Sequence, residues 1–211
     1  MVVCCDLIVM SSAPPSVQPF SDPRISEAEI PTEVEARIAA GGKIVVDETR
    51  VKDELRTKGF GEKEDAEYVL KPYEGLYLMH TKRLRLKNKP DMIFDRLFEL
   101  LLKYDKNIMT KFLVYRDLRS RGYVAKEGFG FGNDFRVYAR GEYEKKPAKY
   151  VVFGLNEGTN VTANHFARAV DQIEKMGKEA IVAVIERRGE VIYYKASKMR
   201  FTENRYNQNN A

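Results

Sequence analysis

Apolar residues recur along this chain with two different periods, and each period predicts a different kind of element. Alternation on both sides of Gly41-Gly42 predicts a strand–turn–strand hairpin within residues 33–48. Spacing of three to four residues predicts helices at three places: around Leu97, around Tyr115 and from about Thr162 to Met176. Shorter apolar runs predict strands at 83–87, around Val137 and at 148–155, and a final hairpin that turns at Arg188-Gly189.

These elements fall into two groups. Residues 35–107 combine a hairpin with helices, whereas residues 108–203 become rich in short strands after Gly122. We therefore predict an α+β fold with an N-terminal mixed sheet-and-helix domain and a strand-rich C-terminal domain. Residues 1–34 contain the Pro- and Ser-rich run SSAPPSVQPFSDPR and are predicted to be a disordered tail, and residues 204–211 a polar tail. Both Met1 and Met10 are compatible with the start of translation.

Composition narrows the class of protein. The chain has 211 residues, of which 44% are hydrophobic and 32% charged, as is typical of a globular protein. Its two cysteines, Cys4 and Cys5, are adjacent and it has two histidines, so we predict no disulfide framework, no metal site and no cofactor. The apolar start MVVCCDLIVM is too short to cross a bilayer, which favours a soluble cytoplasmic protein with no membrane partner. A formal net charge of +5 permits a nucleic-acid partner without requiring one.

Basic and apolar residues alternate along the predicted strand at 83–87. Leu84 and Leu86 point to one face, and the cations of this region are Lys82, Arg83, Arg85 and Lys87. Such a ribbon can follow phosphates, which makes these four residues candidates for RNA binding. The same pattern is typical of an edge strand that positive charge protects against aggregation. The residues alone leave both interpretations open.

The same period of two in DFRVYAR brings a tyrosine between two arginines. Arg136, Tyr138 and Arg140 share the face opposite Phe135 and Val137. Neighbouring guanidinium groups favour the ionised phenol, which is the form that a general base requires. The two arginines are also candidates for RNA contact. An exposed strand tyrosine that stacks on arginine is the alternative interpretation.

Four segments stand out when they are read together: YEGLYLMHTKRLRL, VYRDLRSRGYVAKEGFGFGNDFRVYARG, AKYVVF and AIVAVIERRGEVIYYKAS. In this order, from about Val45 to Lys198, they resemble the archaeal tRNA-splicing endonuclease family. The most specific part is YRDLRSRGY followed by FGNDFRVYARG. The resemblance implies an N-terminal α+β domain and a C-terminal nuclease-like α/β domain. It also implies dimers or tetramers that cut precursor tRNA at bulge-helix-bulge motifs.

The resemblance further implies metal-free chemistry. In the family a tyrosine takes the proton of the ribose 2′-OH, a histidine protonates the 5′-leaving oxygen and a lysine stabilises the charged phosphorane. The products are a 2′,3′-cyclic phosphate and a 5′-OH. Carried over to this chain, the tyrosine falls on Tyr138 and the lysine on Lys178. The histidine opens an HSxYLV-like stretch that reads PAKYVV here, so Pro147 stands in its place, and Gly130 stands where a lysine is frequent.

Proline has no proton to donate, and this departure leads to three hypotheses. The preferred one is a structural subunit of a heterotetramer, in which a catalytic subunit supplies the active sites and the final strand, from Glu190 to Met199, offers an edge to a partner's sheet. The second is a catalytic subunit with an unconventional acid. Its candidates are Lys145, Lys146 and Lys149, although a lysine's ordinary pKa of about 10.4 makes a poor acid at neutral pH. The third is a non-enzymatic RNA-binding protein.

Overall fold

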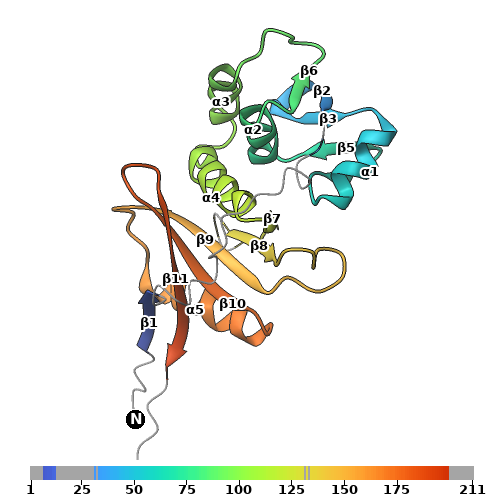
Figure 1. The fold of residues 1–211 in the computed structure, drawn as a ribbon. Coiled ribbons are helices and arrows are strands. Elements are labelled where there is room, and N and C mark those ends of the chain that lie inside the picture. Colours follow the sequence, from blue (N-terminus) through green and yellow to red (C-terminus); the bar gives the residue numbers. More distant parts are fainter. Residues whose placement is uncertain (1–6, 13–30, 32, 131, 133, 200–211) are drawn as a thin grey trace, which may run out of the picture.

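The structure is a computed structural model that describes residues 7–12, 31, 33–130, 132 and 134–199 (Figure 1). It contains two β-sheets with helices between and beside them, which confirms the predicted mixture of α and β elements. The five-stranded sheet and its helices lie at one end of the molecule, and the six-stranded sheet lies at the other. Within these residues, no helix is both long and apolar enough to cross a membrane.

The N-terminal domain is built on the five-stranded sheet, in the order β4-β5-β3-β2-β6. Its strands β2 (Val34–Ile38) and β3 (Ile44–Val46) form the predicted hairpin, whose turn uses positive φ angles of 73° at Gly41 and 78° at Gly42. The other strands are β4 (Glu62–Glu64), β5 (Glu67–Leu70) and β6 (Leu84–Leu86), which is parallel to β2. Three helices accompany the sheet: α1 (Thr49–Thr57), α2 (Pro72–His80) and α3 (Phe94–Leu102).

The C-terminal domain is built on the six-stranded sheet, in the order β1-β11-β10-β9-β8-β7. In chain order its strands are β1 (Leu7–Ser12), β7 (Val124–Glu127), β8 (Asp134–Tyr138), β9 (Tyr150–Asn156), β10 (Glu179–Ile185) and β11 (Val191–Met199). β9 and β10 are parallel, and the other neighbouring strands are antiparallel. A parallel pair needs a crossover connection, which α5 (Ala163–Lys175) supplies.

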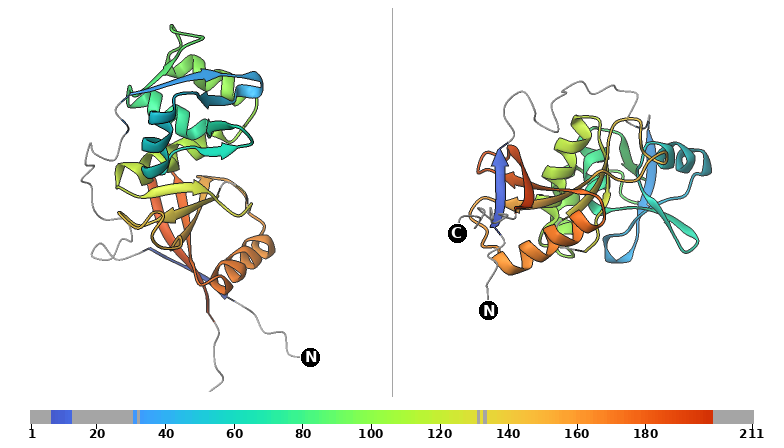
Figure 2. Two further views of the ribbon diagram at one scale, coloured as in Figure 1. Left: turned by 90° about the vertical axis from the view of Figure 1, so that its right-hand side faces the viewer. Right: turned by 90° about the horizontal axis from the view of Figure 1, so that it is seen from below.

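Helix α4 (Ile108–Ser120) connects the two sheets. It contacts α2 and α3 on one side and β7, β9, β10 and β11 on the other, so one apolar core runs through both domains. Val114, Tyr115 and Leu118 are fully buried in this core. The right-hand view of Figure 2 shows α5 on the opposite face of the sheet, where Val170 and Ile173 pack in a smaller core. The two domains are therefore one packed unit.

A buried ion pair also joins the domains. Glu74 of α2 is fully buried, and its Oε1 lies 3.1 Å from Nζ of Lys126 on β7. Oε2 of Glu74 accepts the backbone N–H groups of Gly61 at 2.8 Å and Lys71 at 2.9 Å. The Lys126 ammonium also donates a hydrogen bond to the Gly61 carbonyl, at 2.8 Å. Both charges are thus compensated, as burial requires.

The predicted disordered tail needs one correction. Residues 7–12 form β1, which pairs antiparallel with β11, and Val34 already belongs to β2. Composition does not reveal this pairing, because the hydrogen-bond partners of β1 lie far away in sequence. Consequently, β11 is not an open edge in the described structure, since β10 and β1 flank it. The rest of the predicted N-terminal tail before residue 31 and the polar tail at 204–211 lie outside the described residues.

The predicted basic strand is shorter than expected. β6 covers Leu84–Leu86 rather than 83–87, because Lys82 lies in a turn with a φ of 59° and Lys87 starts the next turn. β6 is an edge strand of its sheet, as one of the two interpretations of its charge pattern required.

Candidate active site

Three strand ends define the candidate site. β8 ends at Tyr138, β9 begins at Tyr150 opposite Val137, and β10 begins at Glu179 beside Tyr150. Because β8 is antiparallel to β9 and β9 is parallel to β10, these three strand termini lie at the same end of the sheet, where β9 and β10 begin. Neighbouring strands are about 4.8 Å apart, which places the end of β8 roughly 10 Å from the start of β10. The sheet thus brings Tyr138 and the residues that precede β9 and β10 into one site.

Tyr138 is half-buried and contacts a second tyrosine. Its ring meets that of Tyr143 edge-on, with the ring centroids 5.1 Å apart. Burial raises the pKa of Tyr143, so this neighbour is a neutral phenol at ordinary pH and places no charge beside Tyr138. Arg136 is directed elsewhere, since its Nε donates to the Glu127 carbonyl at 2.7 Å and its guanidinium lies 5.6 Å from the ring centroid of Phe129.

The remaining member of the predicted Arg–Tyr–Arg face, Arg140, lies in the turn after β8. The alternation of a strand therefore ends before it reaches this residue. Of the three side chains predicted to share one face, only Arg136 and Tyr138 belong to the strand. The prediction of a continuous face was wrong at Arg140.

Lys178 is held against the segment that contains Pro147. It follows the end of α5, is partly buried, and its Nζ donates to the carbonyl oxygen of Ala148 at 2.8 Å. Pro147 itself is exposed, in the loop that connects β8 with β9. The structure therefore places Lys178 beside the chain position at which the family resemblance locates the general acid.

Two of the three lysines near Pro147, Lys146 and Lys149, have partners of their own. Lys149 lies 3.6 Å from a carboxylate oxygen of Glu179, and its ammonium lies 5.0 Å from the ring centroid of Tyr150. Hydrogen bonding to the Tyr150 hydroxyl raises the pKa of Lys149, which makes this lysine a weaker acid at neutral pH. Lys146 pairs with Glu142 at 2.5 Å.

Neither histidine of the chain lies at the candidate site. His80 ends α2, where its ring centroid is 5.9 Å from those of Phe94 and Phe112. His165 is exposed in the first turn of α5, which follows the opposite end of β9. The two ends of this seven-residue strand are roughly 20 Å apart. In the described structure, neither imidazole of this chain is therefore placed to replace the acid at position 147.

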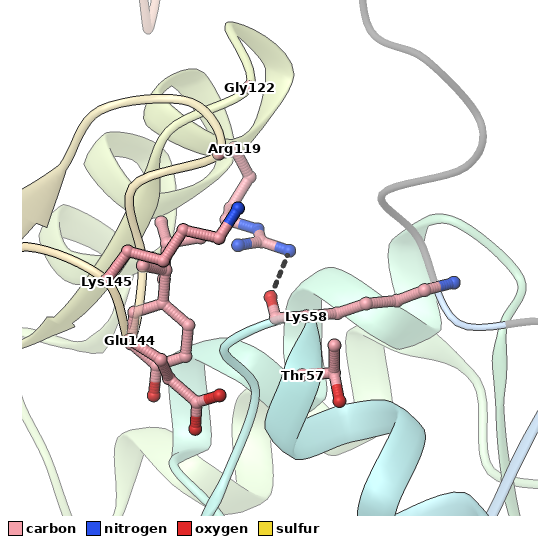
Figure 3. A pocket seen from close by; sticks show the side chains of 9 residues that line it. Thr57, Lys58, Arg119, Gly122, Glu144 and Lys145 are labelled. Carbon is pink, nitrogen blue, oxygen red and sulfur yellow. Dashed lines mark hydrogen bonds between the residues drawn. The ribbon is translucent and has the colours of Figure 1, made fainter.

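A pocket of about 350 Å³ adjoins the site between the two domains. Figure 3 shows Lys145 extending toward Arg119, whose guanidinium donates to the Lys58 carbonyl at 3.1 Å. Tyr143 also lines this pocket, and Glu144 forms an ion pair with Arg56 of α1 at 3.2 Å. The loop between Tyr138 and Pro147 thus contacts the N-terminal domain.

The basic residues of the β6 region lie on the other sheet, at the far end of the N-terminal domain from β8 (Figure 1). Arg85 is 3.4 Å from Glu33, and Lys87 is 2.9 Å from Glu35, so the charges on this part of the ribbon are partly neutralised. The structure does not bring this group of cations together with Tyr138 and Lys178. It forms a separate surface.

Comparison with known proteins identifies the family. Residues 108–193 match the family model for the tRNA intron endonuclease catalytic C-terminal domain, and residues 39–98 match the model for its N-terminal domain. A tRNA-splicing endonuclease of Thermococcus onnurineus is 34% identical over 143 residues, which cover 67% of this chain and 82% of the relative. Relatives of the same name from Methanococcus maripaludis (32% over 142 residues, 66% and 80%) and Thermococcus gammatolerans (30% over 156 residues, 74% and 92%) are similar. The chain belongs to the tRNA-splicing endonuclease family, which confirms the resemblance.

Proposed function

We propose that this chain is the structural subunit of a heteromeric tRNA-splicing endonuclease. Pro147 carries the proposal, because it stands at the position of the family's general acid and has no proton to donate. A missing general acid costs about 10²–10⁴-fold in rate. The catalytic partner subunit supplies the active sites of a heterotetramer in the cytoplasm. That enzyme cuts precursor tRNA at bulge-helix-bulge motifs and leaves a 2′,3′-cyclic phosphate and a 5′-OH, without a cofactor.

The surroundings of Pro147 support this proposal over a catalytic subunit with an unusual acid. Lys149 has a raised pKa, and Lys146 is paired with a carboxylate. Tyr138 and Lys178 remain at the same end of the sheet. Each also has a structural contact: Tyr138 with the Tyr143 ring, and Lys178 with the Ala148 carbonyl. Retention of these two side chains is therefore compatible with a site that no longer works as a whole.

The test is cleavage of an intron-containing precursor tRNA in EDTA. We expect no cleavage by this chain alone and cleavage when it is mixed with a catalytic subunit that is inactive by itself. A mixture that contains the catalytic subunit and heat-unfolded chain is the matched control and should stay inactive. Cleavage by the chain alone would overturn the proposal and would direct attention to Lys145, Lys146 and Lys149. An inactive mixture in which the chain binds precursor tRNA alone would favour a non-enzymatic RNA-binding protein.

We further propose that RNA contacts involve two groups of cations, Arg136 with Arg140 and the ribbon of Lys82, Arg83, Arg85 and Lys87. Replacing Lys82, Arg85 and Lys87 together by Ala is expected to weaken binding of precursor tRNA by the mixed enzyme. The slope of log affinity against log salt should fall by roughly 2–3, because each lost phosphate contact releases about one counterion fewer. Lys175→Ala, which removes an exposed cation paired with Asp171 on α5, is the matched control. An unchanged slope would place the ribbon outside the RNA interface.

A further inference from the structure

The pocket between the two domains is large enough for a small ligand. It has a volume of about 350 Å³, and pockets that bind small molecules typically measure ~300–1,000 Å³. Three segments line it: the end of α1, the end of α4 with the turn before β7, and the loop that follows β8 (Figure 3). The lining includes three cations, Lys58, Arg119 and Lys145, and one carboxylate, Glu144. Positive charge therefore exceeds negative charge on this lining.

Arg119 is buried in spite of its charge, with only 5% of the residue exposed. Its guanidinium lies 4.1 Å from the ring centroid of Phe60 and donates to the Lys58 carbonyl at 3.1 Å, so these two contacts fix the orientation of its plane. A guanidinium presents five N–H donors in one plane, and a pair of them matches two oxygens of a phosphate group. Arg119 is thus preorganised to recognise an oxyanion that enters the pocket.

Lys145 reaches the same pocket from the loop after β8, and Figure 3 shows its side chain extending toward Arg119. The φ angle of Glu144 is 62°, in the left-handed region that non-glycine residues rarely adopt. With this turn of the backbone, the Glu144 carboxylate pairs with Arg56 at 3.2 Å while Lys145 faces the pocket. Within the described part of the chain, the Lys145 ammonium forms no ion pair. The loop thus presents Lys145 to the pocket and engages its carboxylate elsewhere.

The charges on the lining are unevenly compensated. The Lys58 ammonium pairs with Glu54 of α1 at 2.9 Å. Tyr143 contributes a hydroxyl donor rather than a negative charge, because burial raises its pKa. Lys145 and Arg119 bring two positive charges into one small space, where like charges repel each other. An anion bound between these two side chains would remove that repulsion.

We propose that this pocket is a binding site for a phosphate group, which is held between the Arg119 guanidinium and the Lys145 ammonium. A phosphate group has four oxygens and can meet both cations from opposite sides, whereas a carboxylate presents two oxygens on one side. The group belongs either to the backbone of an RNA strand or to free phosphate. The pocket adjoins the candidate active site, because Tyr143 both lines it and contacts the Tyr138 ring. Such a site is compatible with a structural and with a catalytic subunit alike, so it goes beyond the proposed function.

The first experiment is an NMR titration of the isotope-labelled full chain with sodium phosphate, in which sodium chloride keeps the ionic strength constant. We expect saturable shifts of the backbone N–H signals of Gly122, Gly141 and Lys145, which line the pocket. A dissociation constant on the order of millimolar is expected for a ligand with so few atoms. Sodium acetate at the same ionic strength is the control and should give no saturable shift of these three signals.

The second experiment repeats the titration with four variants. Lys145→Ala should weaken phosphate binding roughly ten- to a hundredfold, because it removes one charged hydrogen-bond donor, whereas Lys145→Arg should retain binding. Lys146→Ala is the matched control, because Lys146 is the next exposed cation of the loop but pairs with Glu142 and does not line the pocket. Arg119→Lys keeps the charge but loses the planar pair of donors, so it should also weaken binding. Should Arg119→Lys fail to fold, the comparison of the two Lys145 variants with Lys146→Ala decides, since both positions are exposed.

The third experiment identifies the source of the phosphate group. Its probe is the dinucleotide UpU, which carries one backbone phosphate, and uridine, which carries none, is the control. Saturable binding of UpU that Lys145→Ala weakens would assign the pocket to an RNA backbone, whereas binding of inorganic phosphate without UpU would assign it to free phosphate.

Three results would overturn the proposal. The first is that neither inorganic phosphate nor UpU gives saturable shifts of the three signals. The second is that acetate binds as tightly as inorganic phosphate, and the third is that Lys145→Ala binds as tightly as the unmodified chain. None of these assays contains precursor tRNA or a catalytic subunit, so their failure leaves the cleavage test of the proposed function standing.

Discussion

Glu74→Ala is expected to lower the free energy of unfolding by about 3–5 kcal/mol, because it leaves the buried Lys126 ammonium without its counter-charge. The substitution also removes the acceptor of two backbone N–H groups, those of Gly61 and Lys71. Buried donors without a partner cost a further ~1–3 kcal/mol each where water cannot reach them. Urea unfolding followed by circular dichroism measures this loss.

A second variant separates the charge from the hydrogen bonds. Lys126→Met leaves a carboxylate that still accepts two N–H groups, so it should be less destabilising than Glu74→Ala. Glu74→Gln combined with Lys126→Met removes both charges and keeps an acceptor for the backbone, so the double variant should recover part of the loss. As a control, Lys175→Ala breaks a solvent-exposed pair on α5 and should change the free energy of unfolding by at most about 0.5 kcal/mol. Equal effects of Glu74→Ala and the control would show that the buried pair contributes nothing specific.

Sequence patterns predicted the elements that depend on turn chemistry or on a periodic apolar face. The Gly41-Gly42 hairpin follows from turn chemistry, and α4 and α5 follow from apolar residues that recur every three to four positions. The family could also be predicted, because the segment around Tyr138 is specific as a string of residues. What these predictions share is that each depends on residues close together in sequence.

The features that the sequence did not reveal depend on distant partners. The sequence predicts a disordered tail where β1 lies, because its six residues carry no sign that β11 completes their hydrogen bonds. Glu74 and Lys126 look like ordinary surface charges in sequence, yet 52 positions separate two groups that meet in the core. Tyr143 lies in a charged loop with no periodicity, so no pattern pointed to its contact with Tyr138.

The candidate site could likewise be predicted only in part. The positions of Tyr138, Pro147 and Lys178 came from motif matching, whereas their common location follows from the parallel pairing of β9 with β10. The alternation that predicted Arg140 beside Tyr138 does not hold, because β8 ends at Tyr138, where the chain turns into the loop in which Glu144 pairs with Arg56. Period-two arguments hold only as far as the strand extends.

Pro147→His is expected to confer slow cleavage of precursor tRNA on this chain alone, about 10²–10⁴-fold above the unmodified chain. The reason is that Tyr138 and Lys178 remain at the same end of the sheet, so an imidazole at the exposed position 147 would restore the general acid, the one group that is missing. Single-turnover cleavage in EDTA, with product ends analysed for a 2′,3′-cyclic phosphate, measures the gain.

Two further variants show whether the gain arises from the acid. Pro147→Ala relieves the same backbone constraint without providing a proton donor, so it should stay at the level of the unmodified chain. Tyr138→Phe in the Pro147→His background removes the base and should abolish the gain, while the edge-on contact with the Tyr143 ring can persist. If Pro147→His cleaves no faster than Pro147→Ala, the loss of function extends beyond the acid. The bond from Lys178 to the Ala148 carbonyl would then be the next constraint to examine, because a lysine held by the backbone is not placed to stabilise a phosphorane.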